Sequence, residues 1–185
     1  KFFEEFGAAF KEGIYEDFDR KKSLLDITLF KSSNSENYTS LNEYIARMKD
    51  EQTEIYYISG ESIDQILTSP QIEGYKSRGL EVIYMVDPID EFWLPSMSEY
   101  EGKSFKSITK GIVDLSKFDI KDEKDSKKKK PATKKDIDNL ISEMKSHLGD
   151  KVKDIKSSQM LTDSPVCLTA DEADMDIHLE KLMRQ

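Results

Sequence analysis

The sequence predicts an α/β fold: a helical lead-in, a small three-layer α-β-α unit with a parallel sheet, then a linker and an incomplete α+β unit. Short runs of β-branched and aromatic residues at 54–59 and 80–86, with a more polar run at 103–109, are typical of strands. Helical patterns separate these runs, and strands that alternate with helices form parallel sheets with right-handed crossovers. Charged residues dominate 119–135, a composition that cannot bury enough apolar surface to fold.

Two helices are predicted before the first strand. Apolar residues recur at three- and four-residue steps from Phe2 to Ile14, which gathers aromatic rings on one helix face. A second apolar pattern follows Asp17 and continues to Phe30, where the polar cluster at 32–35 ends it. The chain before this cluster is therefore expected to be helical.

Helix-start signals place further helices around the strands. Ser40, with Glu43 three residues later, forms a capping box and predicts a helix that begins there. Helical stretches are also expected at 62–68 and 70–79, between the first two strands. A proline opens another at 88–100, so each pair of strands is joined by helix.

The second folded part has fewer elements. An amphipathic helix is expected at 137–148, and Asp174 is expected to cap a final helix. A run at 151–157, where Val152 and Ile155 alternate with charged residues, and a short apolar run at 165–169 favour strands. These elements are too few to close a core, so the unit is expected to be incomplete. The predicted boundaries are 1–118 for the first unit, 119–135 for the linker and 136–185 for the second unit.

Composition and charge exclude several classes of protein. A net charge of -9 argues against nucleic acid as a partner, because nucleic-acid binders need a basic face. No apolar run approaches the roughly 18 residues of a membrane span, so no membrane association is expected. Cys167 is the only cysteine, which prevents an internal disulfide and fits a reducing compartment such as the cytoplasm. The sequence opens without an initiator Met and stops inside a helical pattern, so a piece of a longer protein is expected.

No residue pattern predicts a catalytic, cofactor or metal site in this chain. His147 and His178 match no zinc spacing, and both are interpreted as solvated helix residues. The turn at 59–62 follows a strand and opens a helix, so its amides could hold an anion. An ordinary helix cap is the favoured interpretation, since no Walker-type loop occurs.

Three carboxylates, those of Asp87, Asp90 and Glu91, crowd the end of the second strand. Ligands of open parallel sheets bind at that end of the strands. The same residues also open a helix, where negative charge is favourable near the backbone dipole. Helix capping is therefore favoured over a ligand site.

Apolar residues near two helices are candidates for binding. Phe92 and Trp93 point about 100° apart on one helix, so either one ring is partly exposed or both pack between layers. A second stripe lies on the final helix. Stripes of this kind are usually core, but methionine-rich ones also suit adaptable binding to varied apolar partners. Its members are Met175, Leu179, Leu182 and Met183.

Several motifs resemble those of the ninety-kilodalton heat-shock chaperones in order and spacing, over nearly the whole chain. The resemblance is weaker in the linker and at 32–39. The segment 161–165 (LTDSP) is similar to the bacterial HtpG branch of the family. The other motifs are 44–49 (YIARMK), 55–58 (IYYI) with Gly60-Glu61-Ser62, 87–91 (DPIDE) and Gly102-Lys103.

This resemblance implies a three-domain homodimer that uses ATP and Mg²⁺ to remodel unfolded or partly folded client proteins. The chain would span the end of the middle domain and the start of the C-terminal domain. The nucleotide site would then lie before Lys1, and the helices that pair two protomers would lie after Gln185. No ATP-binding residue is therefore assigned to this chain.

The resemblance also implies a client-binding surface. The positions after the Ile-Asp motif match Glu91 and Phe92, with Trp93 beside them, and an entrance helix of the C-terminal domain matches the four-residue stripe. Having two adjacent rings, with Pro95 close by, departs from the family pattern. The predicted function is client binding with interdomain coupling. The alternatives are a purely structural coupling segment and, from the turn at Gly60 alone, an anion-binding domain.

Overall fold

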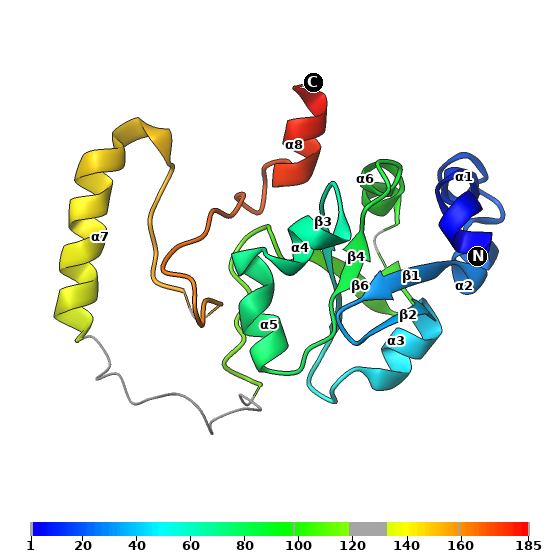
Figure 1. Ribbon diagram of the computed structural model, residues 1–185, viewed down its shortest axis with the longest axis horizontal. Coiled ribbons are helices and arrows are strands. Elements are labelled where there is room, and N and C mark those ends of the chain that lie inside the picture. Colours follow the sequence, from blue (N-terminus) through cyan, green and yellow to red (C-terminus); the bar gives the residue numbers. More distant parts are fainter. Residues whose placement is uncertain (1, 98, 119–132, 159, 185) are drawn as a thin grey trace.

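The computed structural model describes residues 2–97, 99–118, 133–158 and 160–184, and it has the predicted α/β fold (Figure 1). A six-stranded sheet has the strand order β2-β1-β4-β3-β6-β5. Its strands are β1 (Leu29–Ser32), β2 (Ser35–Ser40), β3 (Glu54–Ser59), β4 (Ile83–Met85), β5 (Glu99–Tyr100) and β6 (Lys103–Ser107).

The three central strands confirm the predicted parallel arrangement. β3 pairs in parallel with β4 on one side, where Tyr57 lies opposite Ile83. It pairs in parallel with β6 on the other side, where Ile55 lies opposite Phe105. β3 is buried along both faces, as expected for a strand covered by helices on each side.

Helices connect these strands. The described helices before β3 are α1 (Phe2–Glu16), α2 (Lys21–Ile27) and α3 (Leu41–Arg47). Between β3 and β4 lie α4 (Ile63–Leu67), the 3-10 turn η1 (Pro70–Ile72) and α5 (Glu73–Ser77). Between β4 and β5 lie α6 (Asp90–Trp93) and the 3-10 turn η2 (Leu94–Ser96). The capping box that Ser40 and Glu43 predict is present at the start of α3.

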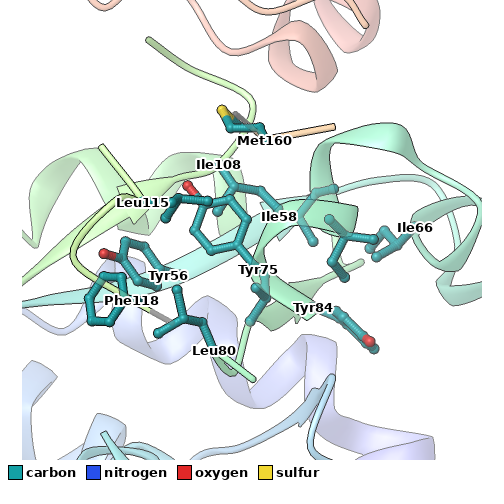
Figure 2. Packing of buried hydrophobic residues seen from close by; sticks show 12 residues of the cluster. Tyr56, Ile58, Ile66, Tyr75, Leu80, Tyr84, Ile108, Leu115, Phe118 and Met160 are labelled. Carbon is teal, nitrogen blue, oxygen red and sulfur yellow. The ribbon is translucent and has the colours of Figure 1, made fainter. Parts of the chain in front are cut away.

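Two hydrophobic clusters, one on each face of the sheet, give the unit its three layers. β3 contributes to both because successive side chains of a strand point to opposite faces. The first cluster (Figure 2) joins Tyr56 and Ile58 of β3 to residues of α4, η1 and α5, namely Ile66, Ile72 and Tyr75. The second joins Ile55 to residues of α1, α2, α3 and α6, namely Ile14, Leu25, Leu41, Tyr44 and Trp93.

Two antiparallel additions to the sheet were not predicted. The second helix ends at Ile27, and the apolar pair after it, predicted as helical, begins β1. β1 pairs with β2 as a hairpin, so the polar cluster is its turn, and β1 also pairs with β4. The helix predicted to run to Tyr100 ends earlier, and β5 pairs with β6. The sheet is therefore mixed around a parallel centre.

In the second unit the structure keeps the predicted helices and lacks the predicted strands. α7 (Lys134–Leu148) starts at a capping box between Thr133 and Asp136, and no residue of α7 is buried. A short 3-10 turn, η3 (Gly149–Lys151), follows it. The run at 151–157 begins in η3 and continues as bends and coil, and the run at 165–169 has no strand, so the prediction of strands there was wrong.

The last helix, α8 (Ile177–Met183), begins later than predicted, because Asp176 rather than Asp174 caps it. Of the predicted linker, 119–132 lie outside the described residues, and the last two positions, Lys134 and Lys135, belong to α7. The assignment of domain boundaries stays a prediction. No helix within the described ranges has the length and apolar character to cross a membrane.

Candidate functional site

Three consecutive residues of α6 point in three different directions. Trp93 is fully buried, Glu91 is 7% exposed and Phe92 is 47% exposed. Successive helical residues are rotated by about 100°, which accounts for this divergence on so short a helix. Of the two alternatives for the paired rings, the structure shows one ring inside and the other outside.

Trp93 belongs to the core. Its indole Nε1 donates a hydrogen bond to Asp90 Oδ1 (2.8 Å), and its ring centroid lies 5.8 Å from Phe105 in an edge-to-face arrangement. The ring of Phe30 lies 6.3 Å away on the sheet. An aromatic ring with its polar atom satisfied in this way holds a helix in place. Trp93 therefore presents no surface to a partner in this structure.

Phe92 lies at the surface, with the ring of Tyr15 as its aromatic neighbour. The two ring centroids are 6.2 Å apart at 68°, an edge-to-face contact between α6 and the end of α1. Tyr15 is itself exposed. Adjacent exposed rings provide apolar surface that a partner can cover. The pair Tyr15–Phe92 is the aromatic surface of this site.

The carboxylates at the start of α6 pair with a buried lysine. Lys11 Nζ lies 2.8 Å from both Asp87 Oδ2 and Asp90 Oδ2, and Lys11 and Asp90 are both buried. Burial alone would lower the pKa of Lys11, but the two carboxylates outweigh it and raise that pKa. Asp90 and Glu91 lie in the first turn of α6, where the capping interpretation placed them near the helix dipole, but no side chain makes a hydrogen bond that caps this helix. The Asp87 and Asp90 carboxylates fasten α6 to α1.

Glu91 bonds to a histidine far along the chain. His178 Nδ1 lies 3.0 Å from Glu91 Oε1, and both side chains are buried. Burial raises the pKa of Glu91, and its bond to His178 acts in the opposite direction. The interpretation of His178 as solvated was therefore wrong, whereas His147 is exposed as expected. No local signal could have found this contact, because it joins residues 87 positions apart.

A pocket of about 120 Å³ lies between the end of β3 and the start of α8. α4 leaves β3 toward one face of the sheet and α6 leaves β4 toward the other, the arrangement in which crevices form at strand ends. Ser59 and His178 line the pocket, and His178 Nε2 has no hydrogen-bond partner within the described residues. Ser62 accepts a hydrogen bond from Gln65 N, so the turn is the ordinary helix cap that was favoured.

The stripe on the last helix is partly exposed. Met183 is 68% exposed at its end, and Leu179 and Leu182 are half-buried. Met175 is exposed as well, but it precedes α8 and is not part of the helix. The Glu91–His178 bond joins α8 to α6, so the two predicted candidate groups lie on helices that contact each other.

Two further contacts, which sequence reasoning missed, fix the start of α8 and the segment before it. Asp176 Oδ2 accepts hydrogen bonds from Ser107 Oγ (2.5 Å) and Thr109 Oγ1 (2.6 Å) at the end of β6. An isolated parallel bridge joins Lys110 to Ala170. The signal available in the sequence was the pair of alternating hydroxyl residues Ser107 and Thr109 at the end of a strand, because hydroxyl groups can donate hydrogen bonds to a carboxylate.

A second carboxylate is held by the LTDSP segment. Glu73 Oε2 accepts hydrogen bonds from the backbone N–H groups of Thr162 (2.9 Å), Asp163 (3.0 Å) and Ser164 (3.1 Å), and the Ser164 hydroxyl donates to Glu73 Oε1. Beside it, Met160 packs into the first hydrophobic cluster (Figure 2). The motif therefore has a structural role in docking the second unit on α5.

Comparison with known proteins agrees with these features. A protein-family model described as "Hsp90 protein" matches residues 1–185. "Chaperone protein HtpG" of Paramagnetospirillum magneticum is 44% identical over 184 residues, covering 100% of this chain and 30% of that protein. HtpG of Wolbachia pipientis is 43% identical over 187 residues, covering 100% and 29%.

A solved structure is also similar. The middle domain of a heat shock protein from Plasmodium falciparum aligns with a TM-score of 0.55 and 34% identity, covering 60% of this chain and 47% of that one. The chain spans about three tenths of the length of the HtpG relatives above. The family match and these identities show that the chain belongs to the Hsp90 family, as a segment that includes part of the middle domain.

Proposed function

We propose that this segment provides part of the surface on which a chaperone holds unfolded or partly folded client proteins. The observation that carries the proposal is the exposure of Phe92 beside fully buried Trp93. A core ring holds α6 rigid while its neighbour, paired with Tyr15, faces solvent. The exposed Met183 and the half-buried leucines of α8 provide a second apolar area.

The surrounding charges suit clients with basic as well as apolar residues. Glu12, Glu16 and Asp19 are exposed near the end of α1, and the whole chain carries a net charge of -9. Burying one aromatic ring against a client contributes about 1–3 kcal/mol, so each contact is weak and exchangeable. Weak contacts of this kind suit a chaperone that must later release its client.

The longer protein is proposed to be an ATP-driven homodimer that works in the cytoplasm. Among the described residues, no group of three or more His, Cys, Asp or Glu side chains is placed to hold a metal ion. The turn at Gly60 is closed by its own helix-cap bonds. Because the chain resembles only part of the family's length, we propose that nucleotide binding and dimerisation belong to other parts of the longer protein.

A titration of the chain into a fluorescently labelled, permanently unfolded protein tests the proposal. Saturable binding is expected, and Phe92→Ala should weaken it several-fold. Leu67→Ala, at an exposed apolar position on α4, is the matched control and should bind as the unchanged chain does. If Phe92→Ala binds the unfolded protein with the same affinity as the unchanged chain, Phe92 is not part of the client-binding surface.

A purely structural role in coupling the two units is the second candidate. The Glu73, Asp176 and His178 contacts favour it, because they join the units through polar bonds, and those of Asp176 and His178 are buried. Absence of client binding up to hundreds of micromolar, with these contacts intact, would favour this role. Acrylamide quenching of Trp93, the only tryptophan, reports whether the core around α6 stays closed during the titration.

A further inference from the structure

We propose that His178 is a positioning residue for the client surface. Its bond to Glu91 orients α8 so that the apolar side chains of this helix (Leu179, Leu182 and Met183, called the α8 stripe) and Phe92 form one surface with two parts. This inference rests on the proposed function. It also assigns Glu91 an indirect role, because its carboxylate bonds to His178 inside the protein and is not available to a client.

The α6 side of the bond is rigid. Trp93 is held by Asp90 and by rings of the sheet, and Asp90 is also paired with buried Lys11. Glu91 faces inward from this fixed helix, and Phe92 follows it on the outward side. A partner of Glu91 therefore acquires a defined position relative to the Phe92 ring.

The α8 side needs such a partner. A helix of seven residues has little stability of its own, so tertiary contacts decide its orientation. Asp176 anchors its start to Ser107 and Thr109 and accepts a hydrogen bond from His178 N (3.1 Å). One anchor fixes where the helix begins, but the helix could still swing about that point. The His178 side chain supplies the second anchor and so determines its direction.

Orientation matters because two weak contacts add only when one client segment can reach both. Holding the contacts at a fixed separation raises the effective concentration of the second contact once the first has formed. If α8 swings freely, that advantage falls even though every apolar residue is still present. We expect loss of the bond to weaken client binding about three- to tenfold, as typical coupling between contacting sites allows.

The experiment compares His178→Leu, which keeps an apolar side chain of similar volume, with His178→Asn, whose amide can replace Nδ1 as the partner of Glu91. Spin labels are attached at Asp64→Cys on α4 and at Arg184→Cys after α8, both of which are exposed positions. The distance between the labels, measured by pulsed electron paramagnetic resonance, reports the orientation of α8. Cys167→Ser is introduced in every variant. Affinity for the labelled unfolded protein is measured on the same samples, and Trp93 emission checks that the first unit is folded.

We expect His178→Leu to broaden the label–label distance distribution and weaken client binding, and His178→Asn to restore both. Weaker binding with an unchanged distance distribution would overturn the proposal, because His178 would then act at the client itself. An unchanged affinity despite a broadened distribution would also overturn it. Phe92→Ala distinguishes failure of this inference from failure of the proposed function. If Phe92→Ala weakens client binding and His178→Leu does not, Phe92 remains part of the client surface and only the positioning role of His178 is wrong. If Phe92→Ala binds as the unchanged chain does, the proposed function fails at Phe92.

Discussion

Lys11 and Asp90 lie 79 residues apart in the sequence and form a buried ion pair 2.8 Å long that ties α1 to α6. Asp87 shares the same ammonium group. Burial raises the pKa of Asp90, and the Lys11 charge opposes that effect. The helix that carries Phe92 therefore depends on a lysine near the start of the chain.

Replacing Lys11 should destabilise the first unit strongly. Lys11→Met leaves two carboxylates beside each other, one fully buried, without a positive partner. Removing one member of a buried pair costs about 3–5 kcal/mol in free energy of unfolding. Urea unfolding followed by Trp93 emission measures the loss. Lys22→Met, which breaks exposed pairs with Asp26 and Glu101, is the control and should change little. Equal effects of the two substitutions would contradict the role given to Lys11.

Some local signals were read correctly from the sequence, whereas contacts between distant residues were not. The capping box of Ser40 and Glu43 involves neighbours only, so its prediction was confirmed. The apolar pair Leu29-Phe30 fits a helix or a strand equally well, and only pairing with β4 decides for the strand. His178 looked solvated because its partner is 87 residues away. The runs at 151–157 and 165–169 have strand-like composition but no ladder of partners in the described residues.

The site shows the same division. The pairing of Phe92 with Trp93 marked α6 as unusual, because adjacent bulky rings cannot face one core. Which ring is buried depends on Phe105 and Phe30, which come from other strands. Sequence patterns therefore indicated the position of the site, whereas the roles of its residues required the fold.

A tyrosine pair offers a clean test of buried hydrogen bonding. Tyr44 and Tyr75 are both fully buried, but only Tyr44 has partners for its hydroxyl. That hydroxyl donates to Glu81 O and accepts from Tyr56 N, both at 2.9 Å. Tyr44→Phe should lower the free energy of unfolding by about 1–3 kcal/mol, because it leaves a buried N–H group without a partner.

Tyr75→Phe is the matched control for this substitution. Its hydroxyl has no hydrogen-bond partner among the described atoms, so removing it should leave stability unchanged or slightly higher. Urea unfolding of both variants gives the comparison directly. A larger loss for Tyr75→Phe than for Tyr44→Phe would show that the two environments have been assigned the wrong way round.

Gly74 allows the second unit to dock closely on α5. A Cβ atom at Gly74 would lie 2.5 Å from the backbone oxygen of Met160, which real contacts do not show. Gly74→Ala should therefore displace the segment around Met160 and cost about 1–3 kcal/mol, despite the better helix propensity of alanine. Gly13→Ala in α1 meets only Leu24 at 3.4 Å and should be neutral or stabilising. The melting temperatures of the two variants, measured by thermal unfolding, should shift in opposite directions, or the decrease for Gly74→Ala should be clearly the larger change.

Glu73 should make the docking of the LTDSP segment dependent on acid. Burial acts to raise the pKa of Glu73, but bonds from the Ser164 hydroxyl and three backbone N–H groups outweigh it and lower that pKa from 4.5 to about 2. The pKa is depressed in the folded state, so the stabilisation is complete above pH 4.5 and is lost as the pH falls through that range toward 2. Docking should therefore weaken between these two values.

Hydrogen exchange at the amides of Thr162, Asp163 and Ser164 measures this dependence, after correction for the intrinsic effect of pH on exchange. Protection should fall as the pH decreases from 4.5 toward 2, because protonated Glu73 accepts hydrogen bonds from these groups less strongly. Glu73→Gln, which has a similar shape and no titrating group, should show lower protection that does not change across the same range. Protection in the unchanged chain that stays constant through this interval would mean that the three amides are held by the surrounding packing and not by the carboxylate.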